Sequence, residues 1–210
     1  MVKVLERTNT EVVEQLAASV SNKQIGILGG TFNPPHLGHL IIADQVMTQL
    51  GLDRVLFMPD ATPPHIDRKL AIDANDRVNM VADSIASNEN FGLELTEVQR
   101  GGLSYTYDTM LELTQKHPEN KYYFIIGGDM VNYLPKWQHI DELVKLVQFV
   151  GVRRENYPVD SPYPVLWVDV PLIDISSTMI RSRVKHGQSI KYFVTDQVAK
   201  YIKERQLYRD

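Results

Sequence analysis

Residues 29–40 read GGTFNPPHLGHL, and they follow directly on the apolar run IGIL at residues 25–28. This order predicts a short buried strand, a glycine turn and the start of an apolar helix. Glycine lets the backbone approach a ligand closely because it has no Cβ, and the amides of a helix start attract anions such as phosphate. His36 and His39 lie three residues apart, so both face the same side of the first helical turn. The stretch therefore predicts a site for the phosphates of a nucleotide.

Downstream of this stretch, short apolar runs alternate with helical patterns. The expected strands cover residues 24–28, 54–58, 91–98, 121–126, 149–152 and 165–170. The expected helices cover residues 37–50, 140–147, 176–185 and 195–205, with two more through Val78 to Ile85 and through Met110 to Leu113, the latter capped by Ser104 or Thr106. Such alternation predicts an α/β fold with a Rossmann-like, doubly wound, mainly parallel sheet, helices on both faces and a small C-terminal helical part.

Two glycine turns are expected to lie at one edge of this sheet. In doubly wound sheets, ligands sit at the carboxyl ends of the strands, near the point where the strand order reverses. The turn at Gly29-Gly30 follows the first strand, and Gly127-Gly128-Asp129 follows the strongly apolar run at 121–126. One cleft is therefore expected to hold both turns.

The composition limits the class of protein. The 210 residues include 22 Lys and Arg against 26 Asp and Glu, a net charge of -4 that disfavours nucleic acid as a partner. The absence of cysteine excludes disulfides, zinc–thiolate sites and a cysteine nucleophile. No apolar stretch reaches membrane-spanning length and no signal-peptide pattern follows Met1, so a cytoplasmic protein with no membrane partner is expected. Residues 1–22 are polar with a faint helical stripe and are interpreted as an N-terminal extension.

Two further motifs follow the histidine pair. Residues 124–130 read FIIGGDM, with YLPKW at 133–137, and residues 175–181 read ISSTMIR. HLGH at 36–39 and ISSTMIR resemble the (H/T)xGH and ISSTxIR motifs of the nucleotidyltransferase superfamily, and the three segments together resemble the bacterial nicotinate-mononucleotide adenylyltransferases. The resemblance covers residues 24–208. It implies transfer of the adenylyl group of ATP to nicotinate mononucleotide, which yields deamido-NAD and pyrophosphate in NAD biosynthesis.

The resemblance also implies a single nucleotidyltransferase domain over residues 23–210, with roles for residues of all three motifs. It implies catalytic roles for His36, His39 and Arg181. ATP binding is implied for Gly29, Gly30, Thr31, Phe32, Gly127, Asp129, Ile175, Ser176, Ser177 and Thr178, and acceptor binding for Asn33, Tyr105, Thr106, Trp137 and Arg154. Mg2+ is expected to arrive with ATP, without a dedicated metal site in the protein. The expected partners are thus the two small-molecule substrates, and a homodimer is a possible assembly.

Such a reaction requires charge stabilisation more than proton transfer. The attacking phosphate of the acceptor is already ionised at neutral pH, so no general base is required. Charge on the α-phosphate and on the departing pyrophosphate has to be stabilised, with the reactants aligned for in-line attack. Histidine donors, helix amides and Arg181, which shares a helical face with Thr178, supply such groups.

Each of these residues also has an alternative interpretation. The two histidines serve as a structural pair or, less favoured, as metal ligands, although the segment offers no suitable third ligand. Ser176 to Thr178 form an ordinary helix N-cap, and Trp137 packs in the core instead of stacking on the nicotinate ring. Asp129 contacts either the ribose hydroxyls or a water on Mg2+.

Three features depart from the pattern of the family. Asn33 stands where the family commonly has Asp, and Ile66 stands where a Lys usually follows the position of His65. The phosphate of the mononucleotide then has the pair Arg68-Lys69 or the pair Arg153-Arg154 as candidate partners. The first 23 residues precede the usual start of the family.

Other functions compete with adenylyl transfer to nicotinate mononucleotide. The nearest is a related adenylyltransferase for another phosphorylated acceptor, such as phosphopantetheine. A non-catalytic nucleotide-binding module would keep the same pocket without turnover. An oxidoreductase with a bound dinucleotide is disfavoured because the G-x-G-x-x-G fingerprint is missing.

Overall fold

The computed structural model describes residues 23–62, 71–153, 161–171 and 173–209. The predicted extension at 1–22 lies outside these residues, as do Arg154 and the basic pair Arg68-Lys69.

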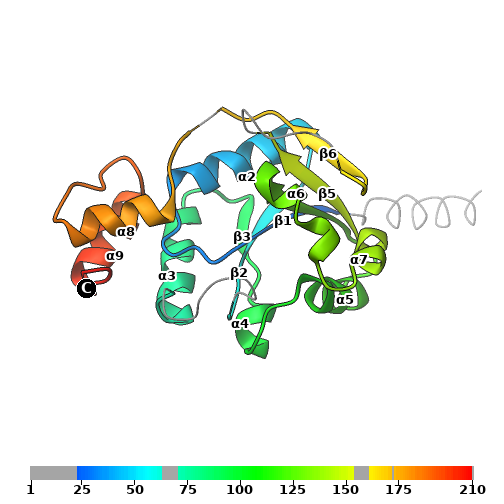
Figure 1. Cartoon of the computed structure of the whole chain (residues 1–210), viewed down its shortest axis with the longest axis horizontal. Helices are drawn as coiled ribbons and strands as arrows, with labels where there is room; N and C mark the ends of the chain where they lie inside the picture. The colour runs from blue at the N-terminus through cyan, green and yellow to red at the C-terminus, as the bar shows by residue number, and fades with distance from the viewer. Residues whose placement is uncertain (1–22, 63–70, 154–160, 172, 210) are drawn as a thin grey trace, which may run out of the picture.

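A sheet of six parallel strands forms the centre of the molecule (Figure 1). The strands are β1 (Gln24–Gly30), β2 (Arg54–Pro59), β3 (Phe91–Leu93), β4 (Lys121–Gly127), β5 (Val147–Val152) and β6 (Val165–Val168), in the order β3-β2-β1-β4-β5-β6. This order reverses between β1 and β4, which is where such sheets bind ligands. Leu28 of β1 pairs in register with Ile125 of β4, so the glycines that end both strands lie at the same edge. The predicted doubly wound parallel sheet is confirmed.

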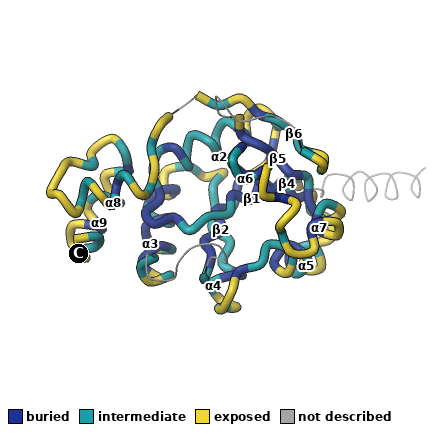
Figure 2. The backbone as a smooth tube through the Cα atoms, in the orientation of Figure 1, coloured by how far each residue is buried: buried dark blue, intermediate teal, exposed yellow. Residues whose placement is uncertain are grey.

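Helices cover both faces of the sheet. They are α2 (Leu37–Leu50), α3 (Ala74–Ile85), α4 (Thr96–Arg100), α5 (Thr106–Lys116), α6 (Gly128–Val131), the 3-10 helix η2 (Leu134–Lys136), α7 (Ile140–Leu146), α8 (Ser177–Lys185) and α9 (Asp196–Glu204). Successive residues of β4 pack on opposite faces of the sheet, and they therefore show the two layers of the core. Phe124 and Ile126 pack in one buried cluster with α5 and α7, whereas Ile125 packs in another with α2 and α3. Burial is therefore concentrated along the strands and on the inner sides of the helices (Figure 2).

The C-terminal helices form a small unit beside α3. Met80 of α3 is fully buried in a third cluster with Ile180 of α8 and Val198 and Ile202 of α9. Thr195 caps α9, because its hydroxyl accepts from the amide of Val198 at 3.3 Å. This unit lies next to the start of α2 (Figure 1), which places it near the predicted phosphate site.

The strand expected over residues 91–98 is wrong in its second half. β3 ends at Leu93, and residues 96–100 form α4. The carboxylate of Glu94 accepts from both the amide and the hydroxyl of Thr96, at 2.9 and 2.6 Å. This local bond competes with strand pairing and supports a helix start, and the alternating pattern gave no sign of it.

Two smaller expectations near the glycine turns also differ from the structure. The residue that precedes α5 is Tyr105, which makes no side-chain cap, so neither Ser104 nor Thr106 caps this helix. The segment 127–137, expected as turn and loop, contains α6 and η2.

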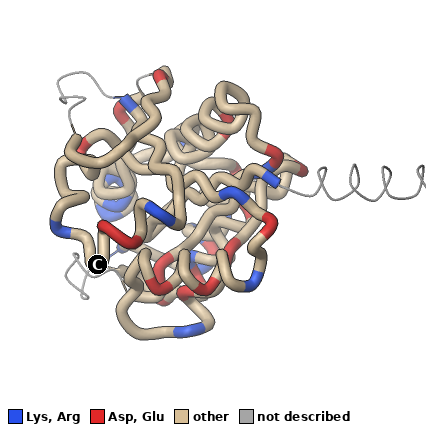
Figure 3. The backbone as a smooth tube through the Cα atoms, turned by 90° about the vertical axis from the view of Figure 1, so that its right-hand side faces the viewer, with Lys and Arg blue, Asp and Glu red and all other residues tan. Residues whose placement is uncertain are grey.

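The described part of the chain has no helix that is both long and apolar enough to cross a bilayer. Acidic and basic residues are interspersed along the described backbone (Figure 3).

A buried arginine joins the ends of β1 and β2. The side chain of Arg77 on α3 is 1% exposed and lies 3.1 Å from the carboxylate of Asp60. Its guanidinium also donates to the carbonyls of Thr31 at 2.8 Å and Asp60 at 2.7 Å, with longer bonds to Ala61 and Ile72. The buried charge is thus paired and hydrogen-bonded, which is the condition under which such a charge is tolerated.

We expect Arg77→Met to lower the free energy of unfolding by about 3–5 kcal/mol, because it leaves a buried carboxylate and several carbonyls without their donor. Urea denaturation measures this loss. Lys200→Met is the control, since it breaks an exposed pair with Glu204 that contributes at most about 1 kcal/mol. Equal losses in the two variants would contradict the role assigned to Arg77.

Candidate active site

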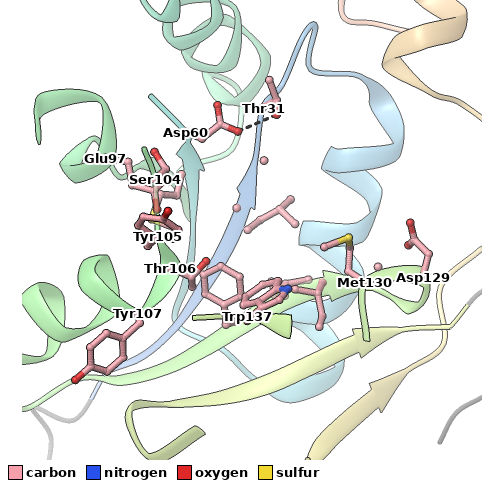
Figure 4. Close-up of a pocket in the computed structure, with 18 of the residues that line it drawn as sticks. Thr31, Asp60, Glu97, Ser104, Tyr105, Thr106, Tyr107, Asp129, Met130 and Trp137 are labelled. Atoms are coloured by element: carbon pink, nitrogen blue, oxygen red, sulfur yellow. Dashed lines mark hydrogen bonds between the residues drawn. The ribbon is translucent and has the colours of Figure 1, made fainter. Parts of the chain in front are cut away.

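A cavity of about 640 Å3 opens at the carboxyl ends of β1 and β4 (Figure 4). It holds both predicted glycine turns, so the expectation of one shared cleft agrees with the structure. Of the predicted site residues, those that line it are Gly29, Gly30, Thr31, His39, Tyr105, Thr106, Gly127, Asp129 and Trp137. Phe32, Asn33, His36, Ile175, Ser176, Ser177, Thr178 and Arg181 are not among its lining residues, and they lie on the loop and helix beside it.

The loop that carries the histidines is held in a strained conformation. Phe32 has φ of 48°, in the left-handed region that non-glycine residues rarely adopt. Its ring is 2% exposed, with its centroid 5.8 Å from that of Phe57 and 5.0 Å from that of His39, edge-on to the latter. Burial of the ring thus stabilises a turn that the backbone alone disfavours. Contact of Phe32 with a phosphate would have to come from its backbone.

The two histidines lie against each other at the start of α2. Their ring centroids are 3.7 Å apart, and the amide of His36 donates to Nδ1 of His39 at 3.1 Å. Because Nδ1 is the acceptor, the neutral ring of His39 carries its proton on Nε2. Nδ1 of His39 thus stabilises the helix start, and contact of its Nε2 proton with a phosphate stays a prediction.

The ISSTMIR motif at residues 175–181 is in direct contact with the turn that precedes the histidine pair. The hydroxyl of Ser177 donates to the carbonyl of Pro34 at 2.7 Å, across 143 residues of sequence. Arg181 donates to the carbonyl of Asn33 at 2.8 Å and to the hydroxyl of Thr178 at 3.2 Å. The structure thus brings together the histidine loop and the Ser-Thr-Arg helix, as the predicted site requires.

Ser176 and Asn33 have structural partners. Ser176 is the N-cap of α8, where its hydroxyl accepts from the amide of Met179 at 3.2 Å. Asn33 is 4% exposed, and its Oδ1 accepts from the hydroxyl of Tyr208 at 2.8 Å. The side chain of Asn33 is therefore held by the C-terminal unit, and its predicted contact with the acceptor stays a prediction.

Gly127 makes room for the carboxylate of Asp129. A Cβ at position 127 would lie 2.6 Å from Oδ1 of Asp129, which is closer than real contacts allow. Asp129 is the second residue of the short helix α6, which directly follows β4, and it lines the cavity. A larger residue at 127 would require this carboxylate to shift from its observed position.

Trp137 is part of the core and also part of the cavity wall. Its ring stands edge-to-face with Phe124 and with Phe149, both at 5.9 Å between centroids. Its Nε1 is buried without a hydrogen-bond partner among the described residues. The packing interpretation therefore applies, and the same side chain still borders the space where a ring could stack.

Three buried polar residues of the cavity were not predicted. Asp60 accepts from the hydroxyl of Thr31 at 2.8 Å, and burial raises the pKa of its carboxyl despite that bond and the charge of Arg77. Glu97 is 4% exposed and accepts from Thr109 at 3.0 Å, and burial also raises its pKa. Ser104 accepts from the amide of Ala61 at 3.0 Å. The position of Asp60 directly after β2 was a usable signal, because that edge of the sheet was already expected to bind ligand.

A glycine turn and a histidine pair at the switch point of a doubly wound sheet define a nucleotide-binding α/β protein. A cytidylyltransferase-like family model matches residues 27–183. The Lactiplantibacillus plantarum protein named "Probable nicotinate-nucleotide adenylyltransferase" is 59% identical over 98% of both chains. A protein of the same name from Streptococcus pyogenes is 54% identical over 96% of both chains. The chain therefore belongs to the cytidylyltransferase-like family and, within it, to the nicotinate-nucleotide adenylyltransferases.

A solved structure has the same fold. The "Plasmodium falciparum nicotinic acid mononucleotide adenylyltransferase complexed with NaAD" matches with a TM-score of 0.75 at 20% sequence identity, over 89% of this chain and 98% of that one. The family predicted from the three motifs is thus confirmed. The match to the Lactiplantibacillus protein covers 98% of this chain, so it includes most of residues 1–22, which that relative shares.

Glu97 provides a test that depends on pH. Its pKa is raised by burial above the ordinary value of 4.5, so the folded protein binds more protons than the unfolded chain in the window above 4.5. The stabilising effect of the neutral carboxyl is therefore lost as pH rises through the folded pKa. Glutamine stays neutral, so in Glu97→Gln this loss should be absent.

We expect wild-type stability to fall relative to Glu97→Gln between pH 4.5 and pH 7.5, as measured by urea denaturation at both values. Glu89→Gln, at an exposed position, controls for the loss of one formal charge. A stability difference that stays constant, or that changes in the opposite direction, would contradict the assigned burial effect.

Proposed function

We propose that this chain transfers the adenylyl group of ATP to nicotinate mononucleotide, giving deamido-NAD and pyrophosphate, with the cavity at β1 and β4 as its site. The observation that carries the proposal is the contact between the two motifs. Ser177 and Arg181 bind the carbonyls of the turn that leads into the histidine pair. Phosphate-binding groups from both ends of the sequence are thereby gathered on one loop.

The reaction exchanges one phosphoanhydride bond for another. An ionised phosphate oxygen of nicotinate mononucleotide attacks the α-phosphorus of ATP. The bond between that phosphorus and the bridging oxygen breaks, and pyrophosphate leaves with the electron pair. No proton has to be removed from the nucleophile, so the protein contributes alignment and charge stabilisation.

The histidine loop is assigned to the triphosphate. The amides of Gly29 to Phe32, at the end of β1 and in the loop before α2, are assigned to the phosphates together with the N-terminus of α2, whose dipole favours negative charge. The Nε2 proton of His39 is assigned to the α-phosphate, where negative charge grows in the transition state. Arg181, placed beside the loop by its bond to Asn33, contributes positive charge to the departing pyrophosphate.

ATP enters as its Mg2+ complex, so the ion belongs to the substrate. Mg2+ keeps most of its waters and binds substrate phosphates in such sites. Among the described residues there is no cluster of three or more His, Cys, Asp or Glu side chains placed to hold a metal ion. Asp129 borders the cavity and is assigned either to the ribose hydroxyls or to a water of this ion.

The acceptor is assigned to the side of the cavity formed by α5 and η2. Tyr105, Thr106 and Trp137 line that side, as their predicted roles require. Tyr105 precedes α5 without a side-chain cap, so the first amides of the helix face no competing acceptor from that residue. The carboxylate of nicotinate suits such amides. Phosphate binding by Arg154, a homodimer, a cytoplasmic location and a single domain over residues 23–210 stay predictions.

The direct test is pyrophosphate release by the pure protein with ATP, Mg2+ and nicotinate mononucleotide. We expect turnover with this acceptor, measured beside nicotinamide mononucleotide and phosphopantetheine. Turnover with phosphopantetheine alone would support the related transferase instead. ATP binding without release of pyrophosphate from any acceptor would point to a non-catalytic nucleotide-binding module.

His39→Ala should lower kcat by about 100-fold or more, as expected for a lost transition-state contact. The folded state should survive, which circular dichroism and thermal unfolding will report. His117→Ala, at an exposed position far along the sequence, is the control and should keep the wild-type rate. A near-normal rate for His39→Ala would leave this residue with its structural role alone.

A further inference from the structure

Three hydrogen bonds from the described residues of the C-terminal unit hold the turn before the histidines. Ser177 binds the carbonyl of Pro34, and Arg181 binds the carbonyl of Asn33. The third bond comes from Tyr208, whose hydroxyl donates to Oδ1 of Asn33 at 2.8 Å across 175 residues of sequence. None of the three motifs includes Tyr208, so no sequence pattern singled it out.

The hydrogen bond between Tyr208 and Asn33 is largely shielded from solvent. Asn33 is 4% exposed, so an amide oxygen without a donor there would carry the full cost of its desolvation. Burial raises the pKa of the Tyr208 phenol, which therefore keeps its proton and remains a donor at neutral pH. The phenol can therefore donate this bond throughout the neutral pH range.

The segment that carries Tyr208 has an unfavourable backbone conformation. Gln206 and Tyr208 have φ of 54° and 61°, both in the left-handed region. The amide of Leu207 donates back to the carbonyl of Ile202 at 3.1 Å and closes a compact turn after α9. Two such residues within three positions persist only where the surroundings favour them. The turn therefore directs the phenol to Asn33 against the intrinsic preference of the chain.

We propose that Tyr208 is a positioning residue for adenylyl transfer. Through Asn33 it fixes the turn at residues 33–34, and thereby the placement of His36 and His39 two to six residues further on. The proposal rests on the function proposed above for the same site. Tyr208 itself is not among the lining residues of the cavity, so it acts through Asn33 and not on the substrate.

The same segment supplies a matched control. Tyr201 on α9 donates to Asp76 of α3 at 2.8 Å, and Arg205 binds the same carboxylate. This bond fastens α9 to the scaffold without touching the histidine loop. Tyr201→Phe and Tyr208→Phe therefore remove the same atom from the same unit, and only the second removes a bond to the loop.

We expect Tyr208→Phe to lower kcat about tenfold with a smaller change in KM for ATP, since a displaced loop weakens alignment more than ground-state binding. Tyr201→Phe should keep kcat within about twofold of wild type, and the melting temperatures of both variants record their losses of stability. Equal kcat values for Tyr208→Phe and wild type would overturn the proposal. Equal losses of kcat in the two variants would also overturn it, because the effect would then follow stability.

A double-mutant cycle tests the route through Asn33. In an Asn33→Ala background the phenol has no acceptor, so adding Tyr208→Phe should cause no further loss of kcat. Additive losses would overturn the route. Asn33→Asp keeps an acceptor oxygen, so adding Tyr208→Phe in that background should still lower kcat, which keeps the test valid if Asn33→Ala does not fold.

An NMR measurement separates this proposal from the function on which it rests. The imidazole resonances of His36 and His39 should shift in Tyr208→Phe and stay in place in Tyr201→Phe, whether or not the protein turns over nicotinate mononucleotide. Absence of pyrophosphate release by the wild type with these shifts present would overturn the proposed function alone. An active wild type with unshifted resonances in Tyr208→Phe would overturn the role of Tyr208 alone.

Discussion

The guanidinium of Arg77 is the constraint on which the site depends. It is a buried charge at the point where β1 and β2 end and α3 begins, and it binds the carbonyls of Thr31 and Asp60 together with the carboxylate of Asp60. Leaving any of these groups unpaired would be costly, so the two strand ends have little freedom to move apart. Thr31, which borders the cavity, is thereby held in place by Arg77.

The histidine loop lies between two supports of different kinds. On one side stands the sheet, whose register aligns the ends of β1 and β4. On the other side stand α8 and α9, which are fastened to α3 by an apolar cluster and by the bonds of Tyr201 and Arg205 to Asp76. A loop with a left-handed Phe32 would not keep one conformation by itself, so both supports are needed to present His39 to a ligand.

Features that depend on local interactions were predicted from the sequence more reliably than features that depend on contacts between distant segments. The helix at 37–50 was predicted with its observed bounds, because its apolar pattern and Gly51 are local signals. The run at 121–126 is similarly clear. The second half of 91–98 failed because one side-chain bond of Glu94 outweighed the alternating pattern. Arg77, Glu97 and Tyr208 were missed because each looks like an ordinary surface residue until segments far apart in sequence enclose it. The joining of the two motifs was expected from family resemblance, and no local pattern required it.

The contact between residues 33–34 and residues 177–208 also sets the order of events during synthesis. The ribosome makes the histidine loop early and the residues that hold it late, with a separation of 175 positions from Asn33 to Tyr208. At about 5–20 residues per second this separation corresponds to roughly 10–35 seconds of translation. During that interval the nascent chain exposes a loop without its supports, so the active arrangement can form only after the last helices have left the exit tunnel.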